Sequence, residues 1–376
     1  MKVAVVHEWL LDYAGSERVV REILEVLPQA DLFALIDRRD AELQGAIPRA
    51  ARTSFLQAFP RPQRWLKYYV PLMPLAVRGL DVSGYDLVVS SSHAVAKGVR
   101  TRKGQLHISY VHTPMRYAWD LREEYLRAAR LDRGPGGWAA RAILERLRRW
   151  DQRSADGVDR LIANSAHVAA RIRAAYGREA EVLHPPVDVA GFPLRADKDD
   201  FYLTVSRLEA YKRVDLLVDA FSRDRTRRLV VVGGGSELQR LKAQAGPNVT
   251  FTGRLPTAQV VEAMQRARAF LFAGIEDFGI VMAEAQACGT PVIAFDRGGA
   301  AEIVRPDTGV LFDAQTPQSI AAAVARFESC SFDPEACRQN ALRFDRPRFR
   351  ERFRAYLGRQ SAMVQGSGVR TSTTSK

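Results

Sequence analysis

One stretch, Arg268–Phe295 (R-A-F-L-F-A-G-I-E-D-F-G-I-V-M-A-E-A-Q-A-C-G-T-P-V-I-A-F), limits the possible fold more than any other. The apolar run Ala269–Phe272 predicts a strand that is buried on both faces. A loop with two glycines follows, and the pattern then predicts a helix from about residue 280 to residue 287. A glycine and a proline end this helix before a second strand over Val292–Phe295. This order of elements predicts an α/β fold with a parallel sheet.

The loop before that helix has the features of a ligand site. Free backbone N–H groups of Phe278, Gly279 and Ile280 form an anion site at the helix N-terminus. Glu276 lies in the loop, and Glu284 lies one to two turns into the helix. Two carboxylates beside a phosphate site could accept hydrogen bonds from hydroxyls, one from those of a sugar and the other from those of a ribose. An isolated pair with this spacing is more often a loop acid and a solvated helix residue, but the flanking strands favour the ligand site.

Length and composition set wider limits. A chain of 376 residues fits two domains of ordinary size. The net charge of +13 suggests anionic partners such as a nucleotide, a nucleic acid or an acidic membrane, or simply a solvated arginine-rich surface. Three cysteines without metal-ligand spacing indicate a reducing compartment. We interpret the N-terminal M-K-V-A-V-V-H-E-W-L as a first strand rather than a signal peptide, and no apolar run approaches the roughly 20 residues of a transmembrane helix.

The first half of the chain contains two further candidate positions. Gly15 lies in a small-residue turn between a strand and an amphipathic helix, an arrangement typical of phosphate or sugar loops, although Ser16 as an ordinary helix N-cap explains it equally well. His112 ends the strand His107–His112, at the carboxyl edge where open α/β sheets bind ligands. A histidine there is either functional or a structural hydrogen-bonding group.

The second half begins after a proline-rich segment at 184–200, which we interpret as a linker. Within it, Asp197-Lys198-Asp199 resembles a D-x-D metal motif, but without a preceding strand we interpret it as solvated charge. Arg207 follows a predicted strand and Lys212 comes five residues later, so two cations at a strand edge are suited to bind a diphosphate. The chain ends with a predicted basic helix at 344–357 (F-D-R-P-R-F-R-E-R-F-R-A-Y-L) and a Ser/Thr/Gly-rich tail after about residue 359.

Two basic stretches, 61–80 and 139–153, combine cations with aromatic or aliphatic residues. Trp65, Tyr68 and Leu72 are suited to an interfacial lipid-facing surface, but core packing between helices is the commoner explanation of such a pattern. The second stretch predicts a basic amphipathic helix, with either a solvated or a lipid-facing surface.

The whole set of motifs resembles a known family. R207-x4-K212, E276-D-F-G-I-V-x-x-x-E284 and the following A-x-G-T-P-V-I-A are similar to those of the family-4 retaining glycosyltransferases of GT-B architecture. Strings such as A-G-S-E-R-V and H-I-S-Y-V-H-T-P-M-R-Y-A-W-D-L resemble bacterial mannosyltransferases of O-antigen and exopolysaccharide synthesis. The resemblance implies an α/β fold of two Rossmann-like doubly wound domains that face each other across a cleft. We expect an acceptor-side domain at 1–190 with helix 345–359 packing back on it, a nucleotide-sugar domain at 191–344, and a disordered tail at 360–376.

The resemblance also implies roles for individual residues. Arg207 and Lys212 bind the donor diphosphate and stabilise the leaving phosphate, while Glu284 holds the ribose and Glu276 the transferred sugar. Gly15 lets the diphosphate and acceptor approach, although Ala14-Gly15 stands where many family members have Gly-Gly. His112 matches a histidine near the sugar and the acceptor. The remaining donor contacts are expected from the backbone of Phe278, Gly279 and Ile280 and, around the base, from Gly253 and Arg254.

The function implied is transfer of a hexose, mannose from GDP-mannose, to a lipid-linked oligosaccharide for surface polysaccharide. We expect no cofactor and no metal, because the two cations stabilise the leaving group. A cytoplasmic protein with peripheral contact to an anionic inner membrane face fits this function. A UDP-sugar donor or a soluble acceptor remains the alternative. A nucleic-acid-binding protein is a remote one, because the charge is spread along the chain and no recognition motif is present.

Overall fold

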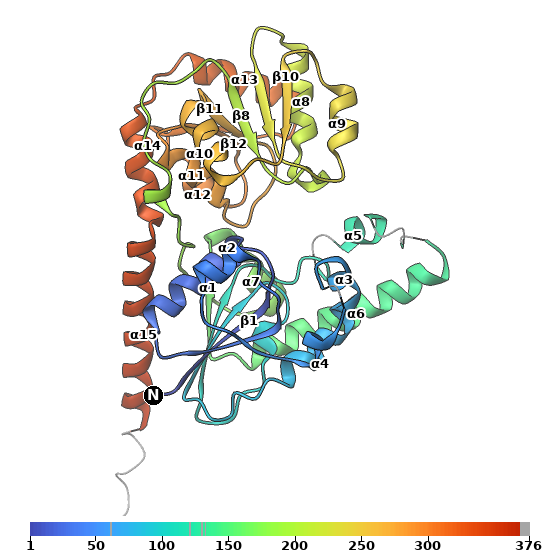
Figure 1. Ribbon diagram of the computed structural model, residues 1–376, viewed down its shortest axis with the longest axis vertical. Helices are drawn as coiled ribbons and strands as arrows, with labels where there is room; N and C mark the ends of the chain where they lie inside the picture. Colours follow the sequence, from blue (N-terminus) through green and yellow to red (C-terminus); the bar gives the residue numbers. More distant parts are fainter. Residues whose placement is uncertain (61, 120–121, 129–130, 132, 369–376) are drawn as a thin grey trace, which may run out of the picture. The chain divides into compact units, whose positions relative to one another are not determined.

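The computed structural model describes residues 1–60, 62–119, 122–128, 131 and 133–368. Arg61 and the tail residues 369–376, which appear in the predictions above, lie outside the described residues. The chain forms two compact units, one made of Met1–His184 with the segment from Phe349 onward, and the other of Pro185–Arg348. The chain therefore crosses between the units twice (Figure 1).

The first unit is built on a parallel sheet of seven strands in the order β3-β2-β1-β4-β5-β6-β7. This order reverses direction beside β1, as in doubly wound folds. Helices cover both faces of the sheet (Figure 1). The strands are β1 (Val3–Leu10), β2 (Asp31–Asp37), β3 (Arg52–Thr53), β4 (Leu87–Ser92), β5 (Leu106–Val111), β6 (Arg160–Ala163) and β7 (Glu181–Val182). The helices are α1 (Gly15–Val26), α2 (Ala41–Ala46), α3 (Pro62–Tyr69), α4 (Met73–Arg78), α5 (Arg122–Ala128), α6 (Gly134–Asp156) and α7 (Ala166–Tyr176).

The second unit repeats the plan with a parallel sheet of six strands in the order β10-β9-β8-β11-β12-β13. The order in which successive strands are added reverses between β8 and β11. The strands are β8 (Tyr202–Val205), β9 (Leu229–Val232), β10 (Val249–Gly253), β11 (Ala269–Phe272), β12 (Val292–Phe295) and β13 (Gly309–Phe312). The helices are α8 (Val214–Arg223), α9 (Leu238–Gln244), α10 (Thr257–Arg266), α11 (Ile280–Ala287), α12 (Ala300–Ile303), α13 (Pro317–Glu328) and α14 (Pro334–Ala341).

The strands are continuous apolar runs because both faces of each sheet are covered. In β11, Ala269 and Leu271 pack into the core under α8 and α13, whereas Phe270 and Phe272 pack into the core under α10 and α11. Successive side chains of a strand point to opposite faces, so a sheet covered on both faces needs apolar residues at every position. The predicted α/β fold with two doubly wound sheets is confirmed.

A long helix, α15 (Arg346–Gly368), starts in the second unit and continues into the first (Figure 1). Phe349, Phe353 and Tyr356 are buried in the same core as β1 and α1. The helix runs past residue 360, where we expect the tail to begin, so residues 361–368 are helical in the structure.

Candidate functional site

The predicted site residues of the second unit lie at the carboxyl edge of its sheet, beside the reversal point. Arg207 comes two residues after the end of β8, and Glu276 comes four residues after the end of β11. These two strands are neighbours in the sheet. Open α/β sheets bind ligands at this position, because the loops leaving the two strands diverge to opposite faces and leave a crevice.

Lys212 and Glu276 meet directly at this edge. The Lys212 Nζ donates a hydrogen bond to Glu276 Oε1, and both side chains are largely shielded from solvent, with 11% and 17% exposed. The ammonium also lies 5.0 Å from the centre of the Tyr211 ring. The Arg207 guanidinium donates to the Tyr211 hydroxyl at 2.7 Å and is exposed. Two cations from the segment around Tyr211 and one carboxylate from the loop after β11 therefore lie at this edge.

The loop after Glu276 has a backbone that requires glycine. Gly279 is the N-cap of α11 and has a φ of 95°, a conformation that other residues rarely adopt. The Glu276 carbonyl accepts a hydrogen bond from the Gly299 N–H at 2.9 Å. A side chain at Gly299 would collide with the Phe278 carbonyl, so the two loops touch backbone to backbone. This packing fixes the start of α11 and its first N–H groups beside the Lys212–Glu276 pair.

The remaining predicted donor residues have different surroundings. Glu284 is only 7% exposed on α11, so it is not the solvated helix residue of the alternative interpretation. Gly253 ends β10 with a φ of 75°, and its carbonyl accepts a hydrogen bond from the Gly233 N–H at 2.8 Å. The Arg254 side chain lies beside Gly234. Gly253 and Arg254 therefore lie next to the glycine segment that follows β9, at the same carboxyl edge of the sheet.

In the first unit, Gly15 is the first residue of α1, and the N-cap is Ala14 rather than Ser16. Glu17 holds this turn. Its carboxylate accepts hydrogen bonds from the Ala14 N–H at 3.2 Å and from the Ser16 hydroxyl at 3.0 Å. The other oxygen of Glu17 lies 3.1 Å from His7 Nε2. Burial by itself lowers the pKa of His7, but the hydrogen bond and charge of Glu17 outweigh it and raise that pKa above its ordinary value.

Glu8 is a second buried carboxylate at this edge, and the sequence did not single it out. Its Oε1 accepts hydrogen bonds from the Ser92 hydroxyl and from four successive backbone N–H groups, those of residues 93–96. Burial opposes ionisation, yet the charges of His93 and His7 and these N–H groups bring the pKa of Glu8 down to about 2. Glu8 is thus an anion that binds the turn after β4 to β1.

His112 follows β5 at the predicted carboxyl edge. Its Nε2 lies 2.8 Å from the Ser91 hydroxyl, and its backbone carbonyl accepts a hydrogen bond from Asn164 at 2.9 Å. Burial, together with the neighbouring His93 and His7, lowers the pKa of His112 to about 3. His112 is therefore a neutral hydrogen-bonding group at ordinary pH.

One interpretation of charged residues in the sequence is wrong, and one predicted helix contains a buried charge that its pattern does not indicate. Lys198 is not solvated: its Nζ donates to the carbonyls of Gln265 and Cys288 and to the Thr290 hydroxyl. The basic amphipathic helix predicted at 139–153 is present as part of α6, and it also carries a buried charge. Its Asp151 is fully buried and pairs with Lys97, and it also accepts a hydrogen bond from the Trp119 indole at 2.8 Å. In both cases a charge in a polar sequence is compensated by partners distant in the chain.

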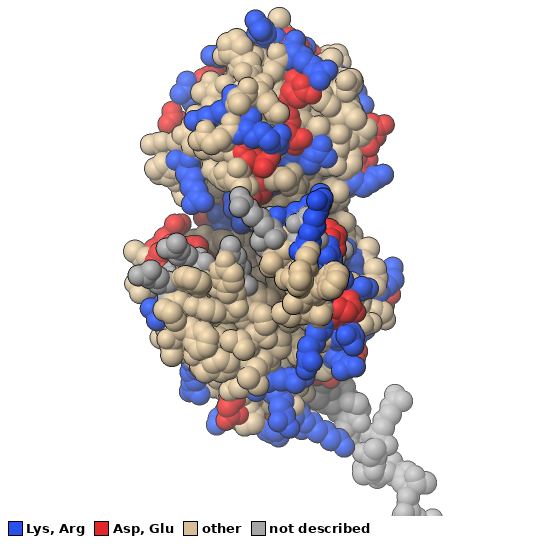
Figure 2. Space-filling model, turned by 90° about the vertical axis from the view of Figure 1, so that its right-hand side faces the viewer, with Lys and Arg blue, Asp and Glu red and all other residues tan. Residues whose placement is uncertain are grey.

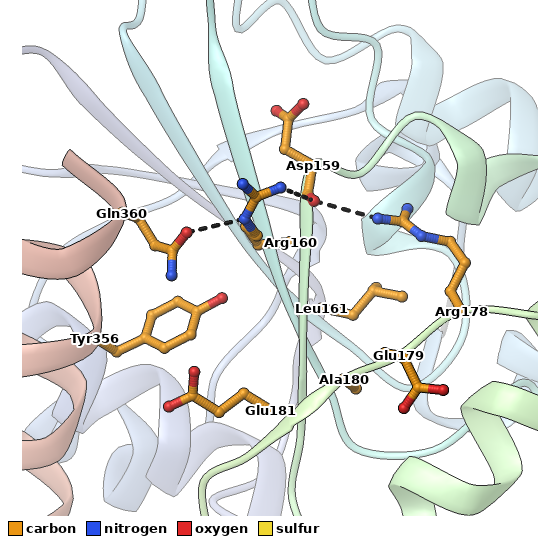
Figure 3. Close-up of a pocket in the computed structure, with 9 residues that line it drawn as sticks. All are labelled: Asp159, Arg160, Leu161, Arg178, Glu179, Ala180, Glu181, Tyr356 and Gln360. Carbon is orange, nitrogen blue, oxygen red and sulfur yellow. Dashed lines mark hydrogen bonds between the residues drawn. The ribbon is translucent and has the colours of Figure 1, made fainter. Parts of the chain in front are cut away.

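A separate hollow lies between α15 and strands β6 and β7 (Figure 3). It is at the amino ends of these strands, opposite the edge that carries the site residues. Its cations are already bound by the protein: Arg160 donates to Gln360 at 2.9 Å, and Arg178 donates to the carbonyls of Val158 and Asp159. The hollow is therefore part of the packing of α15. Among the described residues, no group of histidine, cysteine or acidic side chains has the arrangement of a metal site.

The aromatic stretch 61–80 is only partly core. Tyr69, Met73, Ala76 and Val77 are buried under the sheet, as the core-packing alternative predicts. Other large side chains on the same elements are exposed. Figure 2 views the molecule from the side on which α3, α4 and α6 lie in Figure 1, and it shows a broad area without charge bordered by lysines and arginines. The exposed apolar residues of these elements are Trp65, Tyr68, Leu72, Leu75, Trp138 and Ile143. No helix in the described part of the chain is long and apolar enough to cross a membrane.

Each of the two units matches a family of known proteins. Residues 13–190 match the family described as Glycosyltransferase Family 4, and residues 191–344 match Glycosyl transferases group 1. A GDP-mannose-dependent alpha-(1-6)-phosphatidylinositol monomannoside mannosyltransferase of Mycobacterium tuberculosis is 34% identical over 225 residues, which cover 50% of this chain and 57% of the relative. A D-inositol 3-phosphate glycosyltransferase of Thermomonospora curvata is 31% identical over 239 residues, 53% of this chain and 52% of the relative. The chain thus spans about half the length of the curated relatives it matches.

Solved structures share the fold over nearly the whole chain. A sucrose-phosphate synthase from Thermosynechococcus elongatus has a TM-score of 0.69 at 18% identity and covers 98% of this chain and 100% of its own. Anabaena Alr3699/HepE in complex with UDP has a TM-score of 0.68 at 19% identity and covers 95% and 100%. These likenesses show the fold, and the two family matches follow each other without a gap from residue 13 to residue 344. The chain belongs to the glycosyltransferases of family 4 and group 1, with the GT-B fold.

Proposed function

We propose that the protein is a retaining glycosyltransferase that moves mannose from GDP-mannose to a lipid-linked oligosaccharide during synthesis of a surface polysaccharide. The observation that carries the proposal is the Lys212–Glu276 pair beside Arg207 and the start of α11, at the reversal point of a parallel sheet. A nucleotide sugar needs cations for its diphosphate and acids for its hydroxyls. This one edge supplies both.

The residues divide the chemistry between them. Breaking the bond between sugar and phosphate builds negative charge on the diphosphate, which Arg207 and Lys212 stabilise together with the first N–H groups of α11. Glu276 binds hydroxyls of the transferred sugar, and Glu284 binds those of the ribose. We propose that no metal is needed, because the two cations stabilise the negative charge that a metal ion would otherwise stabilise. The leaving phosphate then helps to deprotonate the acceptor hydroxyl, so no pair of carboxylates of the glycosidase kind is required.

The names of the relatives support mannose and guanine. Two of them, from Mycobacterium tuberculosis and Corynebacterium glutamicum, are GDP-mannose-dependent and are 34% and 33% identical to this chain. Their acceptors are phosphatidylinositol mannosides, which are lipids. The D-inositol 3-phosphate glycosyltransferases favour a second candidate, transfer to a soluble acceptor by the same site.

A lipid acceptor also fits the uncharged, basic-rimmed area around α3, α4 and α6. Trp65, Tyr68 and Leu75 are exposed there, and Arg78 at the end of α4 is exposed beside them. Aromatic and aliphatic side chains with adjacent cations are suited to the headgroup region of an anionic bilayer. We propose that this face holds the protein against the membrane that contains its acceptor.

The test is release of nucleotide from a panel of GDP- and UDP-sugars, with and without added lipid extract. Lys212→Ala and Glu276→Ala serve as site variants, and Arg223→Ala, on the exposed face of α8, is the control. Release of GDP from GDP-mannose that is lost in both site variants and kept in the control supports the donor and the site. Release from a UDP-sugar instead keeps the site and discards GDP-mannose. No release from any donor overturns the proposal.

A further inference from the structure

The buried carboxylate of Glu8 uses its two oxygens unequally. Oε1 accepts five hydrogen bonds, four of them from the backbone of residues 93–96 at 2.9 to 3.1 Å. Oε2 has no hydrogen bond, although it is fully buried. It faces two imidazoles instead, His93 Nδ1 at 3.3 Å and His7 Nδ1 at 3.6 Å. A buried carboxylate oxygen is costly unless it is compensated, so Glu8 attracts the N–H side of these rings.

His93 differs from the other two histidines at this edge. The His7 ring is fully buried, with contacts from Nδ1 to the Ser91 carbonyl and from Nε2 to Glu17. The His112 ring places Nε2 against the Ser91 hydroxyl. The His93 side chain is 24% exposed while its Nδ1 is buried. The exposed part of that ring is therefore the side that carries Nε2.

The surroundings of His93 are those of a residue that meets a ligand. It is the first residue after β4, at the carboxyl edge next to β1. Its ring packs at right angles to the Trp9 indole, with 4.7 Å between the ring centres, and lies 6.1 Å from His112. An imidazole nitrogen directed to solvent thus lies beside an apolar aromatic ring. A pyranose presents both hydroxyls and apolar C–H faces, and this combination suits it.

We infer that His93 is a further substrate-contacting residue, whose Nε2 binds a hydroxyl of the acceptor sugar while Glu8 holds Nδ1. In the tautomer with its proton on Nδ1, the nitrogen that faces Glu8 Oε2 at 3.3 Å, Nε2 carries a lone pair and accepts a hydrogen bond from that hydroxyl. Glu8 then positions the His93 ring, and Glu8 itself is held by hydrogen bonds from four backbone N–H groups. The inference rests on the proposed transferase activity and adds the acceptor contact to it.

The two ring nitrogens can be tested separately, because amide side chains imitate them one at a time. In His93→Asn the amide lies near the position of Nδ1, and in His93→Gln it lies near that of Nε2. His93→Ala removes both. Each variant is assayed for transfer from the active nucleotide sugar to lipid extract, for nucleotide release without acceptor, and for thermal unfolding.

His93→Ala and His93→Asn should lower transfer to the acceptor about tenfold, the effect of one lost hydrogen bond, and leave acceptor-free release unchanged. His93→Gln should restore most of the transfer. The inference is overturned if Asn restores transfer and Gln does not, because the contact to Glu8 would then be all that matters. It is also overturned if all three variants transfer normally. If the unaltered protein releases no nucleotide from any donor, the proposed function fails, which the acceptor-free assay shows separately.

Discussion

Lys212 hydrogen-bonds the carboxylate of Glu276, although 64 residues separate them in the chain. Lys212 follows the first strand of the second sheet and Glu276 follows the fourth, so the contact joins the two loops that leave the sheet in opposite directions. Each side chain neutralises the other. In the proposed function, a diphosphate would compete with Glu276 for the ammonium, and the pair would hold Lys212 in place before the donor binds.

Replacing either partner of this pair should harm both activity and stability. Lys212→Met and Glu276→Gln should each lower nucleotide release at least a hundredfold. Each should also cost about 1–3 kcal/mol of unfolding free energy, because a shielded charge or polar group loses its partner. The double variant should recover part of the stability and none of the activity. Urea unfolding measures the stability, and nucleotide release measures the activity. If the stability losses of the two single variants simply add in the double variant, Lys212 and Glu276 are not energetically coupled and the prediction is wrong.

Gly279→Ala should weaken donor binding beyond its effect on stability. The φ of 95° at Gly279 is strained for alanine, and the new Cβ would meet the end of the buried Met282 side chain, so either this side chain or the start of α11 must shift. Gly177→Ala is the matched control, since Gly177 also has a positive φ, 64°, with open space around it. Both should lose about 1–2 kcal/mol of stability. Only Gly279→Ala should lower the affinity for GDP or UDP, by at least tenfold in calorimetry, and unchanged affinity would contradict the role of α11.

The first unit should lose stability on mild acidification because of His107. Burial lowers the pKa of His107 to about 4 from its ordinary value of 6.5. Between pH 6.5 and about 4 the unfolded chain binds a proton at this site that the folded chain does not, so stability falls as the pH falls through this window. At pH 5 the loss amounts to about 2 kcal/mol.

The change to make is His107→Gln, which keeps a hydrogen-bonding group near Ser90, the partner of His107 Nε2 at 2.9 Å. Urea unfolding at pH 7.5 and pH 5 should show a smaller difference for the variant than for the unaltered protein. His112, whose pKa is lowered to about 3, leaves a residual effect in the same direction. An undiminished pH difference in the variant would show that His107 is not responsible.

Charging the face formed by α3 and α4 should remove membrane binding and spare the donor site. Tyr68 and Leu75 are 60% and 65% exposed, so aspartate at both positions should cost little stability. Sedimentation with phosphatidylglycerol vesicles should show binding at least tenfold weaker, because apolar burial is lost and negative charge is added. Leu194→Asp, an exposed position in the second unit, is the control. Equal sedimentation of all three proteins would contradict a lipid-binding face here.

The helices and strands of the second unit could be predicted because each apolar run there fits only one kind of secondary structure. The strand at Ala269–Phe272, the helix at Ile280–Ala287 and the strand at Val292–Phe295 occur at the predicted residues. A four-residue apolar run bounded by glycine is too short for a helix and too apolar for a surface. The meeting of Lys212 with Glu276 follows once both loops are placed at one sheet edge.

The buried polar network of the first unit was not predicted. His7 and Glu8 lie inside the apolar strand β1, and the prediction of a first strand there gives these two residues no role. That they occur in a strand buried on both faces was itself a signal, because buried polar groups need partners. The partners, Glu17 and the turn at residues 93–96, depend on which loops return to the same edge. A single sequence does not specify such tertiary neighbours.

The path of α15 also determines the order in which the protein can be completed during synthesis. The core around β1 includes Phe349, Phe353 and Tyr356, which the ribosome adds after the entire second unit. The segment that emerges first therefore has to wait, with part of its apolar surface uncovered, until the last helix is released. The second unit is finished earlier, since its residues are consecutive. A chain that stops before residue 349 would keep all the residues of the proposed donor site and leave the core of the first unit without Phe349, Phe353 and Tyr356.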